Sequence, residues 1–289
     1  MDPIGWLGHV LLDPLGRAFF LRALVAAILV GTVCAVVGTY VVLKGLAFIG
    51  DAVSHAAFPG VVASFLLGTP YFLGAAVAAV GTALSIGFVS RRTQLRLDTT
   101  VGVVFAGTFA FGIFLYSTIH GFVMDLMGLL FGNVLLISFE DLLGLVALGL
   151  LVLAVIVVLW KELLYATFDP LGAAASGLPV ELLEYVYLAV VALTIVVSLK
   201  AVGIILVVAM LVTPAATAYL LTHRLSSMML VSAVIGAACS VTGLYLSYYL
   251  NVASGAAVVL TATVLFLLTF VAAPRRGVLA RRAAARRAA

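Results

Sequence analysis

The sequence predicts an all-α integral membrane protein, a polytopic helical bundle of about nine (eight to nine) transmembrane helices. Hydrophobic residues make up 65% of the 289 positions and charged residues only 9%, and the mean hydropathy is +1.34. A soluble domain with this composition would expose a large apolar surface. The few charges gather between long apolar runs. This pattern favours bundled helices, since the strands of a membrane β-barrel alternate over about ten residues.

Nine apolar runs are long enough to span a membrane. The expected spans are residues 18–43, 46–67, 71–90, 100–119, 142–160, 186–199, 202–222, 228–250 and 255–273. One helix over the whole of 186–222 would be about 55 Å long, whereas the apolar core of a bilayer is about 30 Å thick. We therefore divide that stretch at Lys200 and Gly203.

These spans form one membrane domain, residues 1–274, followed by a basic tail at 275–289. Basic residues gather on one side of the nine-span arrangement, at Arg91, Arg92, Arg96, Lys161, Arg224 and in the tail. Since basic loops stay in the cytoplasm, we expect a multi-pass protein of the cell (inner or plasma) membrane with a cytoplasmic C-terminus. Arg17 and Arg22 fall on the opposite side and do not fit this rule. The abundance of Ala and Gly, with Arg favoured over Lys, is typical of a GC-rich prokaryote.

The second expected span carries an aspartate and a histidine, Asp51 and His55, within GDAVSHAAFPG. A spacing of four residues on a helix brings both side chains to one face, one turn apart, where they can hold a cation. Pro59 lacks an N–H and Gly60 follows it, so we expect a kink beside the pair. Ionisable groups inside a span are costly and usually mark a functional site. The alternative is a polar pair that pins two helices together.

Two further polar residues, His120 and Asp125, lie between the fourth and fifth expected spans. In the nine-span arrangement this segment is outside the cell, where the two side chains can attract a cation or help to close an outer gate. The alternative is that they are solvated helix ends.

The longest segment on the cytoplasmic side is 161–185, KELLYATFDPLGAAASGLPVELLEY. Asp169-Pro170 and Gly177-Leu178-Pro179 divide it into short helical pieces, and Pro179 suits the first turn of the next helix. From these residues alone, an ordinary loop is a sufficient interpretation.

The sequence carries no motif of a nucleotide-binding or hydrolytic enzyme. It contains no GxxxxGK[ST], no HExxH and no GxSxG, and no soluble region large enough to hold a nucleotide. We therefore expect a transporter subunit and not an enzyme, with no permanently bound cofactor. The energy for transport would come from a separate ATPase or from an ion gradient. The net charge of +4 comes largely from the tail and indicates orientation in the membrane, not a nucleic-acid partner.

One carboxylate and one imidazole supply two metal ligands, fewer than the four that Zn²⁺ takes or the larger sets of Mn²⁺ and Fe²⁺. A second copy of the chain, related by a two-fold axis, would supply two more. Oxygen and imidazole ligands argue against Cu(I), and histidine favours a transition metal over Mg²⁺ or Ca²⁺. The donor set does not choose among manganese, zinc and iron(II).

Several blocks of the sequence resemble one protein family. GDAVSHAAFPG is similar to G-D-A-x-S-H-A-x-x-P-G, the signature of the permease subunits of bacterial ABC importers for manganese, zinc or iron(II). Five later stretches of this sequence resemble the later blocks of that family in the same order. They are LDTTVGVVFAGTFAFGI (97–113), LLFGNVLLIS (129–138), TFDP (167–170), VGIILVVAMLVTPAATA (202–218) and GLYLSYYLNVASG (243–255). The resemblance covers residues 39–274. It departs at Ala253, where the family often has proline, and at Asn133, where it often has an acidic residue.

The resemblance implies a type II ABC importer-like permease, the membrane subunit of an ATP-driven importer of divalent transition metals. It implies a homodimer in which Asp51 and His55 form the intramembrane metal site, a cytoplasmic ABC ATPase dimer that binds the ATP, and an extracytoplasmic metal-binding protein. Residues 161–185 resemble the family's coupling segment. Its candidate contacts with the ATPase are Phe168, Asp169, Pro170 and Gly177.

Two alternatives remain open. One is an ABC permease for a metal chelate such as a siderophore or cobalamin. The other is a gradient-driven ion carrier in which Asp51 and His55 relay protons.

Overall fold

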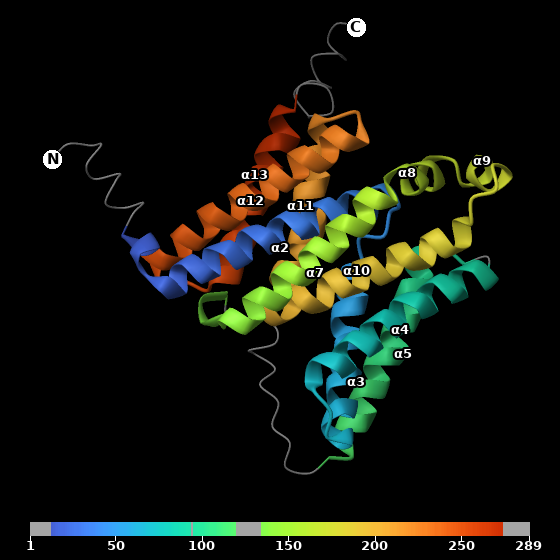
Figure 1. Cartoon of the computed structure of the whole chain (residues 1–289), viewed down its shortest axis with the longest axis horizontal. Coiled ribbons are helices and arrows are strands. Elements are labelled where there is room, and N and C mark those ends of the chain that lie inside the picture. The colour runs from blue at the N-terminus through green and yellow to red at the C-terminus, as the bar shows by residue number, and fades with distance from the viewer. Residues whose placement is uncertain (1–12, 94, 120–133, 274–289) are drawn as a thin grey trace, which may run out of the picture.

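The computed structural model describes residues 13–93, 95–119 and 134–273 (Figure 1). Within these ranges every regular element is helical, and nine of the helices are long and apolar enough to cross a membrane. These nine are α2 (Ala18–Leu43), α3 (Ile49–Leu67), α4 (Tyr71–Arg92), α5 (Leu97–Ser117), α7 (Phe139–Val158), α10 (Val180–Val202), α11 (Ile204–Leu221), α12 (Leu225–Leu250) and α13 (Ser254–Ala272). The prediction of an all-α bundle with about nine spans is confirmed.

Shorter helices complete the described chain. They are the 3₁₀ turns η1 (Pro14–Gly16) and η2 (Val134–Leu136), and the α-helices α8 (Trp160–Phe168) and α9 (Pro170–Ala175). The division of the sixth and seventh spans is confirmed at Gly203, whose φ of 80° separates α10 from α11, whereas Lys200 lies within α10. His120, Asp125 and the tail at 275–289 lie outside the described residues.

The second span starts later than the sequence suggested. Gly45, at a φ of 68°, follows α2, and the Leu46 N–H donates to the Val41 carbonyl oxygen at 2.9 Å. This is the left-handed glycine termination common at helix ends. Residues 44–48 therefore form a turn, and α3 begins at Ile49 and not at residue 46.

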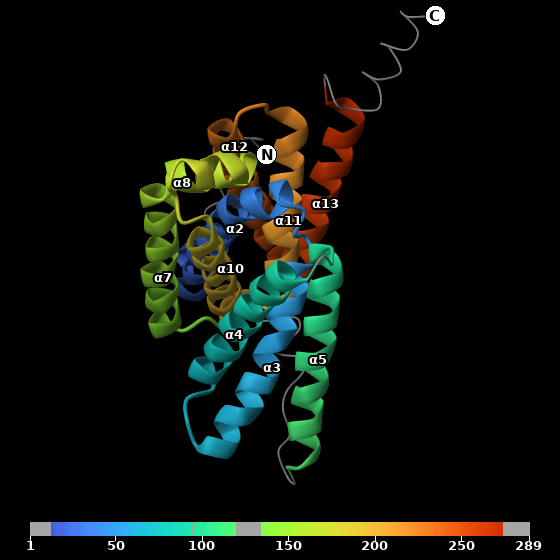
Figure 2. The ribbon, with the colours of Figure 1, turned by 90° about the vertical axis from the view of Figure 1, so that its right-hand side faces the viewer.

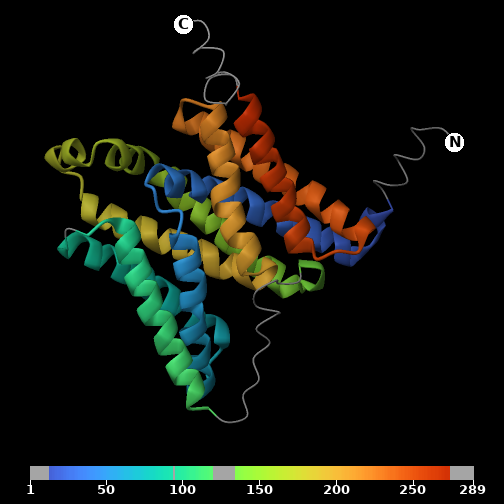
Figure 3. The ribbon, with the colours of Figure 1, turned by 180° about the vertical axis from the view of Figure 1, so that it is seen from behind.

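The helices fall into two groups (Figures 1 and 2). α3, α4 and α5 lie together at one end of the molecule in every view, including the view from behind (Figure 3). α2 runs through the other group, packed against α11, α12 and α7. α10 contacts both α4 and α7 and so joins the two groups, while α8 and α9 lie at the edge beyond the start of α10.

Glycines allow the helix backbones to approach closely, as expected for packing inside a membrane. A Cβ atom on Gly60 of α3 would overlap the carbonyl oxygen of Gly74 in α4 and lie 2.7 Å from the Ala78 Cβ. A Cβ atom on Gly38 of α2 would overlap the carbonyl oxygen of Leu211 in α11. The α3–α4 and α2–α11 pairs therefore depend on a glycine at the point of contact.

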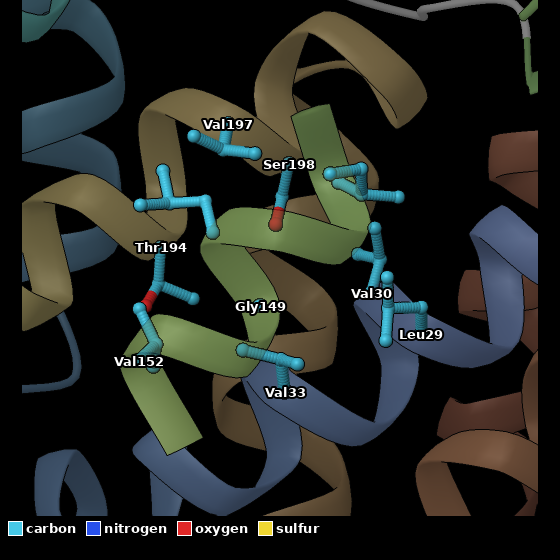
Figure 4. Close-up of a pocket in the computed structure, with 10 residues that line it drawn as sticks. Leu29, Val30, Val33, Gly149, Val152, Thr194, Val197 and Ser198 are labelled. Carbon is cyan, nitrogen blue, oxygen red and sulfur yellow. The ribbon is translucent and has the colours of Figure 1, made fainter. Parts of the chain in front are cut away.

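A narrow gap lies where α2, α7 and α10 meet (Figure 4). Its volume is about 10 Å³, close to the least that one water molecule needs. Its hydroxyl groups already have partners, since Thr194 Oγ1 donates to the Val190 carbonyl oxygen and Ser198 Oγ lies 3.6 Å from Cys34 Sγ. The gap is therefore a packing feature between three helices and not a ligand site.

Candidate metal site

The two ionisable residues of α3 lie near its start. Asp51 is in the first helical turn, where the partial positive charge of the helix N-terminus favours a carboxylate. His55 follows one turn later, and both residues are half-buried. Among the residues that the structure describes, no third His, Cys, Asp or Glu joins them in a group able to hold a metal. One chain therefore offers two ligands at this position.

The His55 imidazole has contacts to two helices. Its Nδ1 atom lies 2.9 Å from the Asp51 carbonyl oxygen. Phe105 and Phe109 of α5 pack against the ring at centroid distances of 5.5 and 5.6 Å. No motif in the sequence singles out these phenylalanines. Their only signal was an aromatic pair at helical spacing within the block 97–113.

The turn after His55 is packed tightly. Pro59 and Gly60 are buried, and α3 continues through both as one helix. Gly112 of α5 faces them, because a Cβ atom there would lie 2.8 Å from Phe58 Cδ1 and 2.9 Å from Pro59 Cδ. The proline region thus fixes how α5 sits against α3.

The start of α3 also rests on α11. A Cβ atom at Gly50 would lie 3.5 Å from side-chain carbons of Val208 and Leu211. The backbone of Leu211 contacts Gly38 of α2. α11 therefore sits between α2 and the residue that precedes Asp51.

One buried polar group of α3 lacks a hydrogen-bond partner. The Ser54 hydroxyl, between Asp51 and His55 in sequence, is buried and unpaired within the described part of the chain. A buried unpaired hydroxyl is costly.

Charged residues gather where α2, α4 and α10 meet. Arg91 of α4 forms an ion pair with Glu184 of α10, and Lys44, just after α2, lies over the Tyr187 ring at 5.5 Å. Burial lowers the pKa of the Lys44 ammonium; Glu184 acts to raise it and Arg91 to lower it. The cluster links the turn that leads into α3 to the start of α10, next to α8 and α9.

The segment 161–185 contains the two short helices expected from its sequence. Asp169 separates them, and its Oδ1 atom accepts a hydrogen bond of 2.8 Å from the Gly172 N–H at the start of α9. Pro170 is the first residue of α9, and Gly177 follows α9 with a φ of 83°. Phe168 and Leu171 are 61% and 84% exposed, an arrangement suited to contact with another protein.

In the described part of the chain, nine apolar helices of spanning length make this a polytopic membrane protein, and the carboxylate and imidazole on α3 and the exposed short helices α8 and α9 are consistent with a permease. The chain belongs to the ABC 3 transport family, whose model matches residues 17–273. It is therefore a multi-pass protein of the cell membrane.

Curated relatives match nearly the whole chain. It is 45% identical over 267 residues to the manganese transport system membrane protein MntC of Halalkalibacterium halodurans, covering 92% of this chain and 91% of that protein. It is 43% identical over 272 residues to the manganese transport system membrane protein MntB of Synechocystis, covering 94% and 89%. It is 38% identical over 259 residues to the chelated iron transport system membrane protein YfeD of Yersinia pestis, covering 90% and 87%.

Solved structures share the fold. A chain of PsaBC from Streptococcus pneumoniae in complex with Fab matches with a TM-score of 0.83 at 38% identity, covering 96% of this chain and 99% of that one. A putative metal-chelate type ABC transporter in an inward-facing conformation matches with a TM-score of 0.70 at 17% identity, covering 93% and 89%. The second likeness concerns the fold alone.

Proposed function

We propose that this chain is the permease subunit of an ATP-driven importer that carries a divalent transition-metal ion into the cytoplasm past Asp51 and His55. The observation that carries the proposal is the half-buried acid and imidazole pair at the start of α3. An oxygen and an imidazole nitrogen together suit manganese, iron(II) or zinc. Curated relatives named for manganese transport favour manganese among these.

Two copies of the chain complete the site in this proposal. Each contributes Asp51 and His55, which gives two carboxylates and two imidazoles about a two-fold axis. α5, the helix beside His55, leaves Gly102 exposed, and no atom from another described helix lies within 4 Å of a Cβ added there. Small exposed residues allow another helix to approach closely within a membrane.

The energy comes from a separate ATPase. In this proposal α8 and α9 lie in the cytoplasm and dock on it, with the exposed Phe168 and Leu171 as apolar contacts. The basic loops and the C-terminal tail then lie on the cytoplasmic side. A metal-binding protein delivers the ion on the opposite side, where His120 and Asp125 are proposed to help close the outer gate.

A metal chelate is the second candidate cargo, because one curated relative is named for chelated iron transport. A bare ion needs ligands from the protein, whereas a chelate brings its own. Competition by a siderophore-bound metal against the free ion separates the two candidates.

We expect cells that lack this chain to lose uptake of radioactive manganese, and a plasmid copy to restore it. Depleting ATP should stop uptake, whereas a protonophore that leaves ATP intact should not, since the proposed importer does not use an ion gradient. Uptake that is equal with and without the chain would contradict the proposal. Uptake that follows the proton gradient would instead favour a gradient-driven carrier.

Asp169→Ala is expected to slow uptake several-fold while metal binding stays unchanged. The variant removes the side chain that caps α9, and loss of such a cap costs about 1 kcal/mol of local helix stability. Asp169→Asn keeps a cap and should transport almost as the wild type does. A normal uptake rate for Asp169→Ala would count against α9 as the coupling element.

A further inference from the structure

The position of the His55 ring is set by contacts from two directions. A hydrogen-bond acceptor, the Asp51 carbonyl oxygen, lies 2.9 Å from Nδ1 on the same helix. The rings of Phe105 and Phe109 approach from α5, inclined to the imidazole by 71° and 86°. The hydrogen bond and the aromatic contacts act on different parts of the imidazole.

The hydrogen bond selects one form of the ring. A carbonyl oxygen can only accept, so the bond requires a proton on Nδ1. In a neutral imidazole the other nitrogen, Nε2, then holds the free lone pair. Metal binding needs such a lone pair, and histidine ligands commonly hold the other ring nitrogen by a hydrogen bond of this kind.

The phenylalanines restrict how the ring can turn. Phe105 and Phe109 are one helical turn apart on α5 and stack on each other with centroids 5.9 Å apart. Both meet the imidazole nearly edge to face, a favourable geometry for aromatic rings. Rotation of the imidazole away from the Asp51 carbonyl would break these contacts as well as the hydrogen bond.

The rest of α5 shows that this contact is specific to one face. Gly112 holds α5 against Phe58 and Pro59 of α3, whereas Phe111 and Phe114 are 57% and 65% exposed. Phenylalanines thus occur on both faces of α5, and only Phe105 and Phe109 contact His55. The exposed pair provides a matched control.

We propose that Phe105 and Phe109 are positioning residues that, with the Asp51 carbonyl, hold His55 in its Nδ1–H form and present Nε2 to the transported ion. The identity of the ion rests on the function proposed above. The protonation of the ring nitrogens does not, and it can be measured without any metal.

The experiment uses the full chain in lipid nanodiscs, isotope-labelled at the ring nitrogens of its four histidines. Nitrogen NMR at about pH 8.5, above the ordinary titration range of histidine, distinguishes Nδ1–H from Nε2–H. His55→Gln identifies the His55 signals. The variants are the double substitution Phe105→Leu/Phe109→Leu and the control Phe111→Leu/Phe114→Leu, and Mn²⁺ affinity is measured on the same samples.

The wild type and the control should show His55 with Nδ1–H alone. The Phe105→Leu/Phe109→Leu variant should show both forms and bind Mn²⁺ about tenfold more weakly, at the lower end of the range for groups that orient a metal ligand. Phe109→Tyr, which keeps the ring, should behave as the wild type. A role in packing alone would lower stability without changing the ratio of the two forms.

Two results would overturn the inference: a wild type with Nε2–H, or a double-leucine variant that keeps His55 in the wild-type form, whatever its affinity for Mn²⁺. One further result would overturn only the proposed function: the forms of His55 change as expected in the double-leucine variant, but the wild type binds no metal ion.

Discussion

Purified wild-type chain is expected to bind one divalent transition-metal ion per two copies, and Asp51→Ala and His55→Ala are each expected to lose it. Each variant removes two of the four ligands of the proposed paired site, because the site uses both copies. Mutating a group that only orients a ligand costs about 10- to 100-fold in affinity, so removing a ligand should cost at least about 100-fold. Metal analysis of the protein in nanodiscs, with manganese, zinc and iron(II) in competition, measures the stoichiometry and ranks the metals.

Asp98→Ala is the matched control for the metal-binding experiment. Asp98 is an exposed acid in the first turn of α5; like Asp51 it is an aspartate in the first turn of a helix, but its helix carries no histidine. It should leave the stoichiometry unchanged. If the wild type binds no ion, or if Asp51→Ala and His55→Ala both bind as well as it does, then Asp51 and His55 either have a structural role or relay protons.

Gly38→Ala is expected to destabilise the protein by about 3 kcal/mol, at the upper end of the range for overpacking. The added methyl group would overlap the Leu211 carbonyl oxygen and lie 2.8 Å from its carbonyl carbon. These are backbone atoms, so no side-chain rotation can relieve the overlap and α2 must move away from α11. The protein is heated in detergent, and size-exclusion chromatography then measures the fraction that stays monodisperse at each temperature.

Gly144→Ala serves as the control for Gly38→Ala. Gly144 lies on α7, and among the described residues no atom outside that helix's backbone comes within 4 Å of an added Cβ, so the substitution should be neutral or stabilise the helix by up to about 1 kcal/mol. Equal stability of the two variants would refute the tight α2–α11 contact. Because Leu211 also approaches Gly50, Gly38→Ala should additionally weaken metal binding at Asp51.

The sequence predicted the helices well, but it was less accurate about where they begin. Composition and the length of apolar runs predict nine spans because each span must satisfy its own backbone hydrogen bonds inside a bilayer. The start of α3 was expected at residue 46 and lies at Ile49, since the Gly45 turn uses Leu46 to complete the end of α2. α10 begins at Val180, next to Pro179 as expected, so it extends beyond the apolar run that starts at residue 186, and Glu181 and Glu184 lie within its first turns.

The candidate metal site likewise has one part that the sequence predicted and another that it did not. The spacing of Asp51 and His55 places both on one helical face whatever surrounds the helix. The contact of His55 with Phe105 and Phe109 depends on α5 lying beside α3, which in turn depends on Gly112 meeting Pro59.

By itself, therefore, the sequence determined the helical membrane class, predicted about nine spans and placed an acid and an imidazole on one helical face, because these follow from local periodicity and from the cost of burying polar groups. Only the tertiary structure decided which helices touch, that Leu211 lies between Gly38 and Gly50, and that α5 supplies the rings around His55. Such contacts join residues far apart in the chain. They depend on side-chain shape, which is not encoded in any local pattern.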